Sequence, residues 1–120
     1  MELVADVYRT TAQLPEDERF GLRNQLRRAA VSVPSFLAEG HARGSTKEFM
    51  RYAGIAMGSI AEMETQLLIC LKLELLNEAS ARPILEQCNE QNRILRGPKK
   101  SLTSRLRNSP SSLVPHTSPL

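Results

Sequence analysis

Aromatic side chains are scarce in this sequence. Only 4% of its 120 residues are aromatic, and tryptophan is absent. Aliphatic and small side chains must therefore supply most of the packing in a chain that is long enough for one modest core. Such a composition favours helices over strands.

Cysteine and histidine are almost as rare, which limits the available chemistry. Cys70 and Cys88 occur in apolar patterns without Cys-x-x-Cys spacing, and neither His41 nor His116 is near a candidate nucleophile in sequence. These spacings offer no Cys/His or Ser/His catalytic arrangement and no metal-ligand cluster. The two cysteines are expected to be buried free thiols, because packed helix axes about 8–10 Å apart usually leave Cα atoms too distant for a disulfide.

Two other kinds of site are also missing. Four acids would suit a carboxylate-bridged metal site in a helical bundle, but none of them belongs to the Glu-x-x-His motif of such sites; they are Glu62, Glu64, Glu86 and Glu90. No glycine-rich phosphate loop is present, and the mid-helix positions of Gly54 and Gly58 are better explained by packing. We predict no enzyme activity, no metal, no cofactor and no small-molecule substrate.

Long apolar runs are absent as well. The longest covers residues 67–71, which is far too short to span a membrane, and no signal peptide opens the chain. Together with the free thiols, this predicts a cytoplasmic protein without a membrane partner.

Charge, in contrast, is abundant and arranged in blocks. Residues 1–18 carry five acids and one base, and residues 19–51 carry seven bases and two acids. Residues 52–92 return to six acids and two bases, and residues 93–107 carry six bases and no acid. The alternation favours complementary self-association or an anionic partner, although ordinary solvated helix faces would give a similar pattern.

Apolar residues recur at helical spacing in four segments, and no segment alternates with the period of a strand. The first segment covers residues 2–14, and the second opens at Pro15 with an acidic first turn and ends near Gly40 and Gly44. Pro34 should kink or break it by about one turn. The sequence therefore predicts an all-α antiparallel four-helix bundle with a kinked second helix.

The third segment is the longest and begins at a capping box formed by Ser45 and Glu48. Its apolar positions recur at 4–3 intervals over residues 46–76: Phe49, Ala53, Ala56, Ile60, Met63, Leu67 and Cys70. A turn at residues 77–80 leads to a fourth helix, which Gly97 and Pro98 should end or sharply kink. We predict a bundle domain over residues 1–103 and a disordered Ser/Pro-rich tail over residues 104–120.

Basic residues on both sides of the turn between the second and third helices form the main candidate site. They are Arg23, Arg27, Arg28, Arg43, Lys47 and Arg51. Such residues could present a multi-point phosphate surface, and the few aromatic residues nearby indicate electrostatic, sequence-tolerant binding. Glu39 is expected to be partly buried and to have a structural role, either pairing with an arginine such as Arg43 or capping a neighbouring helix. The block at residues 93–107 either adds to this surface or only aids solubility.

The sequence resembles a bacterial family of four-helix bundle proteins, over residues 1–102. The residues that carry the resemblance are Leu14-Pro15, Gly21-Leu22, Gln25-Leu26-Arg27-Arg28-Ala29-Ala30-Val31-Ser32-Val33-Pro34-Ser35, Ala38-Glu39-Gly40, Lys47-Glu48-Phe49, Ile55-Ala56, Gly58-Ser59 and Glu64-Thr65-Gln66-Leu67. The family includes proteins encoded in intervening sequences of large-subunit ribosomal RNA and is similar to the accessory proteins of diversity-generating retroelements.

The resemblance implies a homopentameric ring with a basic surface that binds nucleic acid, and it implies no enzyme. It also implies a first helix that begins earlier than this one, with a tryptophan, and an asparagine where Phe36 stands here. Our sequence-based hypothesis is a non-enzymatic homo-oligomeric bundle that binds RNA or DNA through the basic residues. The alternative is a self-assembly scaffold that does not bind nucleic acid.

Overall fold

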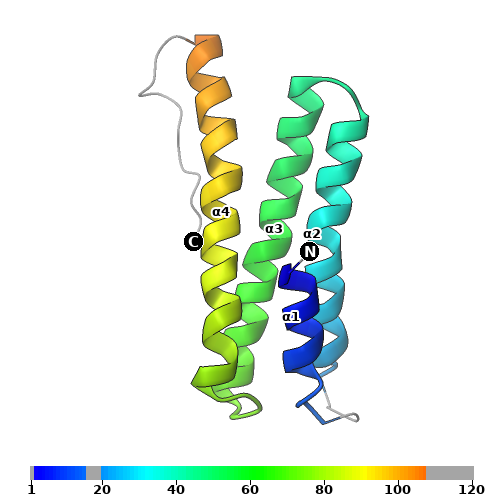
Figure 1. Ribbon diagram of the computed structural model, residues 1–120, viewed down its shortest axis with the longest axis vertical. Coiled ribbons are helices and arrows are strands. Elements are labelled where there is room, and N and C mark those ends of the chain that lie inside the picture. The colour runs from blue at the N-terminus through cyan, green and yellow to red at the C-terminus, as the bar shows by residue number, and fades with distance from the viewer. Residues whose placement is uncertain (1, 16–19, 108–120) are drawn as a thin grey trace.

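The computed structural model describes residues 2–15 and 20–107, with side chains up to residue 97. This part of the chain forms four helices and no strand: α1 (Glu2–Thr11), α2 (Leu22–Ala42), α3 (Thr46–Lys72) and α4 (Glu78–Arg107). Figure 1 shows α2, α3 and α4 running up and down beside one another, with α1 along the lower half of the molecule. The predicted all-α four-helix bundle is confirmed.

Local signals set the ends of α3 and α4. The Ser45 hydroxyl accepts a hydrogen bond of 3.1 Å from the backbone N–H of Glu48, so the predicted cap is present. Gly44 precedes it with φ +80°, a conformation that favours glycine and ends α2. The amide oxygen of Asn77 likewise accepts a hydrogen bond of 2.8 Å from the N–H of Ser80 and caps α4.

The predicted start of the second helix at Pro15 is wrong. The helix begins at Leu22, after Gly21, whose φ of +67° is left-handed and incompatible with a continuous right-handed helix through this point. The acidic residues that suggested the earlier start belong to residues 16–19, which lie outside the described part of the chain.

Internal prolines do not interrupt the helices. The helix α2 continues through Pro34 to Ala42, so of the two predicted outcomes, a kink or a break, the break does not occur and the single kinked helix is the one retained. Ser32 and Ser35 lie beside Pro34, and their hydroxyls donate to the carbonyls of Ala29 at 2.8 Å and Val31 at 2.9 Å.

The helix α4 likewise continues beyond Pro98 to Arg107, so the predicted end at Gly97 and Pro98 is wrong. A proline deprives only the carbonyl four residues earlier of its partner, here that of the exposed Ile94, which water can satisfy. The helix therefore crosses the predicted domain boundary after residue 103. The rest of the predicted tail, residues 108–120, lies outside the described residues.

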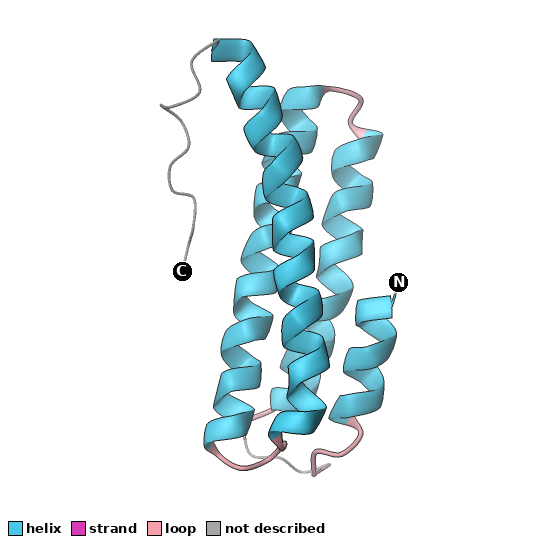
Figure 2. Cartoon of the chain, turned by 60° about the vertical axis from the view of Figure 1, so that its left-hand side comes forward, coloured by secondary structure: helices cyan, strands magenta, loops and turns pink. Residues whose placement is uncertain are grey.

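The four helices contact one another in a cycle. The central helix α3 packs between α2 and α4, and α1 contacts α2 and α4 on the opposite side. Within the described residues, no Cα atom of α2 lies within 8 Å of one in α4, and none of α1 lies within 8 Å of one in α3. Figures 1 and 2 both show α1 beside only the lower half of the longer helices, where it closes the bundle.

Hydrogen bonds tie α1 to the distant helix α4. The side-chain amide of Gln87 donates to the carboxylate of Asp6 at 2.6 Å, across 81 residues of sequence. At the lower end, the hydroxyl of Ser80 donates to the amide oxygen of Gln13 at 3.2 Å. The first helix therefore joins α4 to α2 on the side of the bundle opposite α3.

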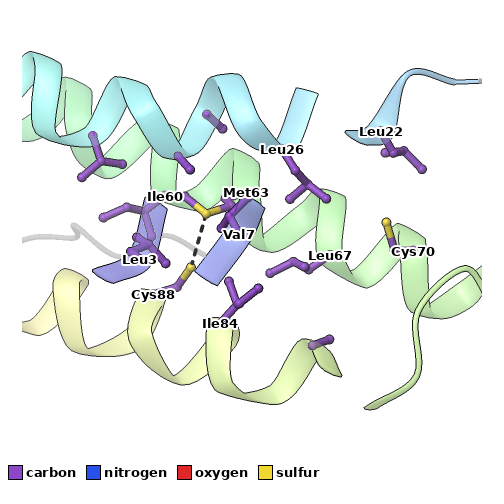
Figure 3. Packing of buried hydrophobic residues seen from close by; sticks show 14 of the residues in the cluster. Leu3, Val7, Leu22, Leu26, Ile60, Met63, Leu67, Cys70, Ile84 and Cys88 are labelled. Atoms are coloured by element: carbon purple, nitrogen blue, oxygen red, sulfur yellow. Dashed lines mark hydrogen bonds between the residues drawn. The ribbon is translucent and has the colours of Figure 1, made fainter. Parts of the chain in front are cut away.

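The predicted seam of α3 is the centre of the core. Its residues from Ala53 to Cys70 are buried, whereas Phe49 is only partly buried. Figure 3 shows Ile60, Met63 and Leu67 between residues of the other three helices, which include Leu3, Val7, Leu26 and Ile84. By length and composition alone, α3 would also be apolar enough to cross a membrane, as is common for the core helix of a soluble bundle.

Two glycines have different surroundings. Gly40 lies inside α2 and does not end it, and a Cβ atom on it would lie 2.7 Å from the Cβ atom of Tyr52 on α3. The glycine therefore permits the close approach of these two helices. Gly58 is exposed, and a Cβ there would have nothing within 4 Å, so packing inside this chain does not explain it.

Both cysteines are buried thiols outside any disulfide, as predicted. The Cys88 thiol donates a long hydrogen bond to the Met63 sulfur at 4.0 Å (Figure 3). Burial, reinforced by the nearby negative charge of Glu64, raises the pKa of Cys88 to about 12. A thiol of this kind is inert while the bundle is folded.

Thiol labelling should report this burial. At pH 8, we expect both cysteines to react with iodoacetamide only as fast as the protein unfolds, because neither is accessible and the Cys88 thiolate is scarcely populated. In urea above the unfolding midpoint, both should react within the labelling time, as followed by mass spectrometry. A cysteine that reacts in the native protein as fast as in the denatured chain would contradict this burial.

Candidate nucleic-acid interface

The six predicted basic residues fall into two groups rather than one cluster. Three lie in the first turns of α2, and three lie around the turn to α3. The α-helical rise of about 1.5 Å per residue separates Arg27 from Arg43 by about 24 Å along the axis. The lower group lies beside α1 and the upper group lies at the opposite end of the bundle (Figure 1).

In the lower group, Arg27 binds α1. Its Nε donates to the hydroxyl of Thr11 at 2.8 Å, and its Nη2 donates to the carbonyl of Tyr8 at 3.0 Å. Its guanidinium also lies 4.4 Å from the centre of the Tyr8 ring. These contacts fix the position of α1 on α2.

Arg23 has a similar structural role. Its Nη2 donates to the carbonyl of Leu14, just after α1, and its Nε is buried without a hydrogen-bond partner. Arg28, in contrast, is exposed and has no ion pair or hydrogen bond within the described residues. Of the three lower arginines, Arg28 is therefore the one that is available to an external anion.

The upper group is organised by Tyr52. Arg43 donates to the hydroxyl of Tyr52 at 2.9 Å and to the carboxylate of Glu39 at 3.0 Å, and the Tyr52 hydroxyl lies 3.4 Å from the same carboxylate. The guanidinium groups of Arg43 and Arg51 lie 5.3 and 4.7 Å from the centre of the Tyr52 ring. One buried aromatic ring thus orients two arginines.

Two carboxylates partly balance this upper group. The predicted pair of Glu39 with Arg43 is present, but the predicted burial is wrong, because the Glu39 side chain is 48% exposed. The hydrogen bond that Arg43 donates to the Glu39 carboxylate raises the pKa of Arg43. Arg51 lies 3.5 Å from Glu48, whereas Lys47 is exposed without an ion pair among the described residues.

The role of Tyr52 was not predicted, because nothing in the sequence showed that its ring would align two arginines. A weak signal was present, because Arg51 adjoins Tyr52 and the end of α2 returns close to the start of α3. Neither fact specifies a stacking geometry without the structure.

The acidic residues considered for a metal site do not converge. Within the described residues, no three of His, Cys, Asp and Glu are close enough to hold a metal ion. Glu64 is half-buried against α4, and burial raises the pKa of its carboxyl, although the attraction of Arg96 opposes this rise. This part of the chain therefore offers charged surfaces and hydrogen-bonding groups.

Comparison with known proteins identifies the family. The family of 23S rRNA-intervening sequence proteins matches residues 1–97, which include all four helices except the end of α4. The chain belongs to this family. The resemblance noted from the sequence is thereby confirmed.

One solved structure supports the fold. It is a protein of unknown function from the S23 ribosomal protein family of Bacteroides thetaiotaomicron, with 21% sequence identity and a TM-score of 0.70. The match covers 81% of this chain and 88% of that one. A search among curated proteins finds no match. At this identity, the similarity to the solved structure concerns the fold alone.

Proposed function

We propose that this intervening-sequence protein is a non-enzymatic, homo-oligomeric bundle that binds RNA or DNA electrostatically. The observation that carries the proposal is the set of exposed cations along α2 and the start of α3. Arg28 and Lys47 have no partner within the described residues, and Arg43 and Arg51 are held in place by Tyr52. Arg23 and Arg27 support this surface by holding α1.

The expected binding is sequence-tolerant. Tyr52 is only 7% exposed, and one face of Tyr8 is covered by Arg27, so neither offers an open face for base stacking. Each phosphate contact releases counterions and contributes about 0.7 to the slope of log affinity against log salt for a single strand. Four cations would give a slope of about 3.

Self-association forms the second part of the proposal, with the pentamer that the family resemblance implies. The exposed side of α3 supports it, because Leu68, Ile69 and Leu73 are each more than 40% exposed and Gly58 lies on the surface of the same helix. An apolar face of this kind is typical of an interaction surface. If this face alone carries the function, the protein is an assembly scaffold without nucleic-acid binding.

The nucleic-acid part is tested by replacing three exposed cations together. We expect the Arg28→Gln/Lys47→Gln/Arg51→Gln variant to bind a fluorescently labelled structured RNA at least tenfold more weakly than the wild type, because three phosphate contacts are lost. Binding should be measured by anisotropy at two salt concentrations on nuclease-treated protein, with the mass of the assembly from light scattering.

The matched control is Arg9→Gln/Lys72→Gln/Arg82→Gln, which removes the same charge from exposed positions elsewhere in the described chain. Its affinity should remain much closer to that of the wild type. Equal losses in both variants, or wild-type binding that ignores salt, would contradict the proposed surface. A protein that assembles but binds no RNA or DNA would be the scaffold alternative.

A further inference from the structure

The second half of α4 carries charge that the proposed surface leaves unused. From Gln91 to Arg107 the sequence holds six bases and no acid. Because α4 continues beyond Pro98, this whole block lies on one helix. The basic positions 93, 96, 100 and 107 follow a spacing of three, four and seven residues, which places them on one side of an α-helix.

An open recess lies at the start of this block. It has a volume of about 480 Å³, and the residues that line it are Asn89, Asn92, Arg93, Arg96 and Gly97. Arg93 donates to both carboxylate oxygens of Glu90 at 2.6 Å, so its charge is partly balanced. The amides of Asn89 and Asn92 make no hydrogen bond with the described residues.

Arg96 is the distinctive residue of the recess. Its Nε is buried and has no hydrogen-bond acceptor within the described part of the chain. The positive charge of Arg96 lowers the pKa of Glu64, opposing the effect of burial, but the two side chains do not form an ion pair within 4.0 Å. A buried donor without an acceptor destabilises the folded protein, because it loses its hydrogen bonds to water and gains none in return. A bound anion that accepts from the guanidinium would remove this cost.

We propose that this recess is a second nucleic-acid contact, in which Arg96 binds a phosphodiester group of RNA. The planar guanidinium matches two oxygens of one phosphate, and the two asparagine amides can donate to the phosphate or the ribose. Gly97 lines the recess and has no side chain that would narrow it. The space beside it is open, because a Cβ atom there would have nothing within 4 Å.

This contact rests on the proposed function and extends it. The start of α3 and the later turns of α4 lie at the same end of the bundle (Figure 1). Arg43, Lys47 and Arg51 are therefore at the same end as the basic block of α4. One RNA strand long enough to span the end of the bundle would contact both surfaces.

The test uses the whole chain and a labelled, unstructured single-stranded RNA of about 20 nucleotides. We expect Arg93→Gln/Arg96→Gln to bind about tenfold more weakly and to reduce the salt slope by about 1.4, which corresponds to two phosphate contacts. Arg96→Lys should lose part of the affinity, because it keeps the charge but lacks the bidentate guanidinium. The control is Arg82→Gln, which removes an exposed arginine paired with Glu78 on the same helix.

The measurements distinguish the α4 contact from the proposed function on which it rests. If the double variant binds as Arg82→Gln does, while the Arg28/Lys47/Arg51 variant loses affinity, the α4 contact is overturned and the proposed function stands. A wild type that binds no RNA overturns both. Tighter binding of poly-glutamate than of RNA would identify an acidic protein as the ligand and overturn the RNA assignment. Circular dichroism should show unchanged helix content in every variant.

Discussion

Replacing Arg27 with methionine is expected to destabilise the protein by about 3.5 kcal/mol, the lower end of the sum of its contacts, because hydrogen bonds from a charged donor contribute about 1.5–3 kcal/mol each and a cation–π contact about 0.5–1 kcal/mol. The variant loses its bonds to Thr11 and the Tyr8 carbonyl and its contact with the Tyr8 ring. Methionine keeps the aliphatic packing of the arginine stem. Urea denaturation followed by circular dichroism measures the change.

Arg28→Met is the matched control, because Arg28 is the next residue on α2, is exposed and has no partner within the described residues. Its stability should stay within about 0.5 kcal/mol of the wild type. Hydrogen exchange should accelerate in residues 2–14 of Arg27→Met and not of Arg28→Met. Equal stabilities for the two variants would mean that Arg27 does not hold α1.

Gly40→Ala is expected to destabilise the protein by up to about 2 kcal/mol, since overpacking costs about 1–3 kcal/mol and alanine recovers about 1 kcal/mol of helix propensity. The added methyl group would lie 2.7 Å from the Cβ of Tyr52 and 3.4 Å from the Cα of Phe49. These atoms belong to or adjoin the backbone of α3, so relief requires the two helices to move apart. The same denaturation assay applies.

Gly58→Ala provides the opposite expectation. The added methyl group would meet nothing within 4 Å in the chain, so alanine should stabilise α3 by about 0.5–1 kcal/mol. The two substitutions are chemically identical and both lie inside helices, so their difference measures the α2–α3 contact. A destabilisation of similar size at both positions would contradict the close approach at Gly40.

Much of the fold follows from periodicity. The 4–3 spacing of apolar residues identified the buried seam of α3 from Ala53 to Cys70, because each turn of a helix must present an apolar residue to the core. The capping signal at Ser45 was equally direct, since a hydroxyl there satisfies a backbone N–H that the helix leaves free. Both signals depend only on nearby residues.

Helix ends were predicted less reliably where two residues close in sequence could each end or begin a helix. Pro15 and Gly21 each mark a helix boundary, and the left-handed backbone at Gly21 decided the start of α2. At Pro98, the loss of one hydrogen bond did not outweigh helix formation on either side of it. Helix propensity alone does not show which proline or glycine ends a helix, because the packing around each residue determines the free energy that the residue costs there.

The candidate site was less predictable for a related reason. The sequence identified which residues are basic but not which of them form hydrogen bonds within the chain. In the structure, Arg23 and Arg27 donate hydrogen bonds to residues in or just after α1. Tyr52 and the recess beside Arg96 arise from side chains that converge in space. The charge blocks therefore indicated an anionic partner or self-association, whereas the structure indicates which of the basic residues remain available for that contact.

The bridging position of α1 has a consequence for the order of folding. The hairpins α2–α3 and α3–α4 join neighbours in sequence, whereas the bond between Asp6 and Gln87 closes a loop of 81 residues. Closing distant loops slows folding, so the two hairpins should form the nucleus and α1 should dock after the rate-limiting step. Weakening α1 would then speed unfolding and leave the refolding rate almost unchanged. Of the four helices described, the earliest in the sequence is thus expected to be the last to reach its place.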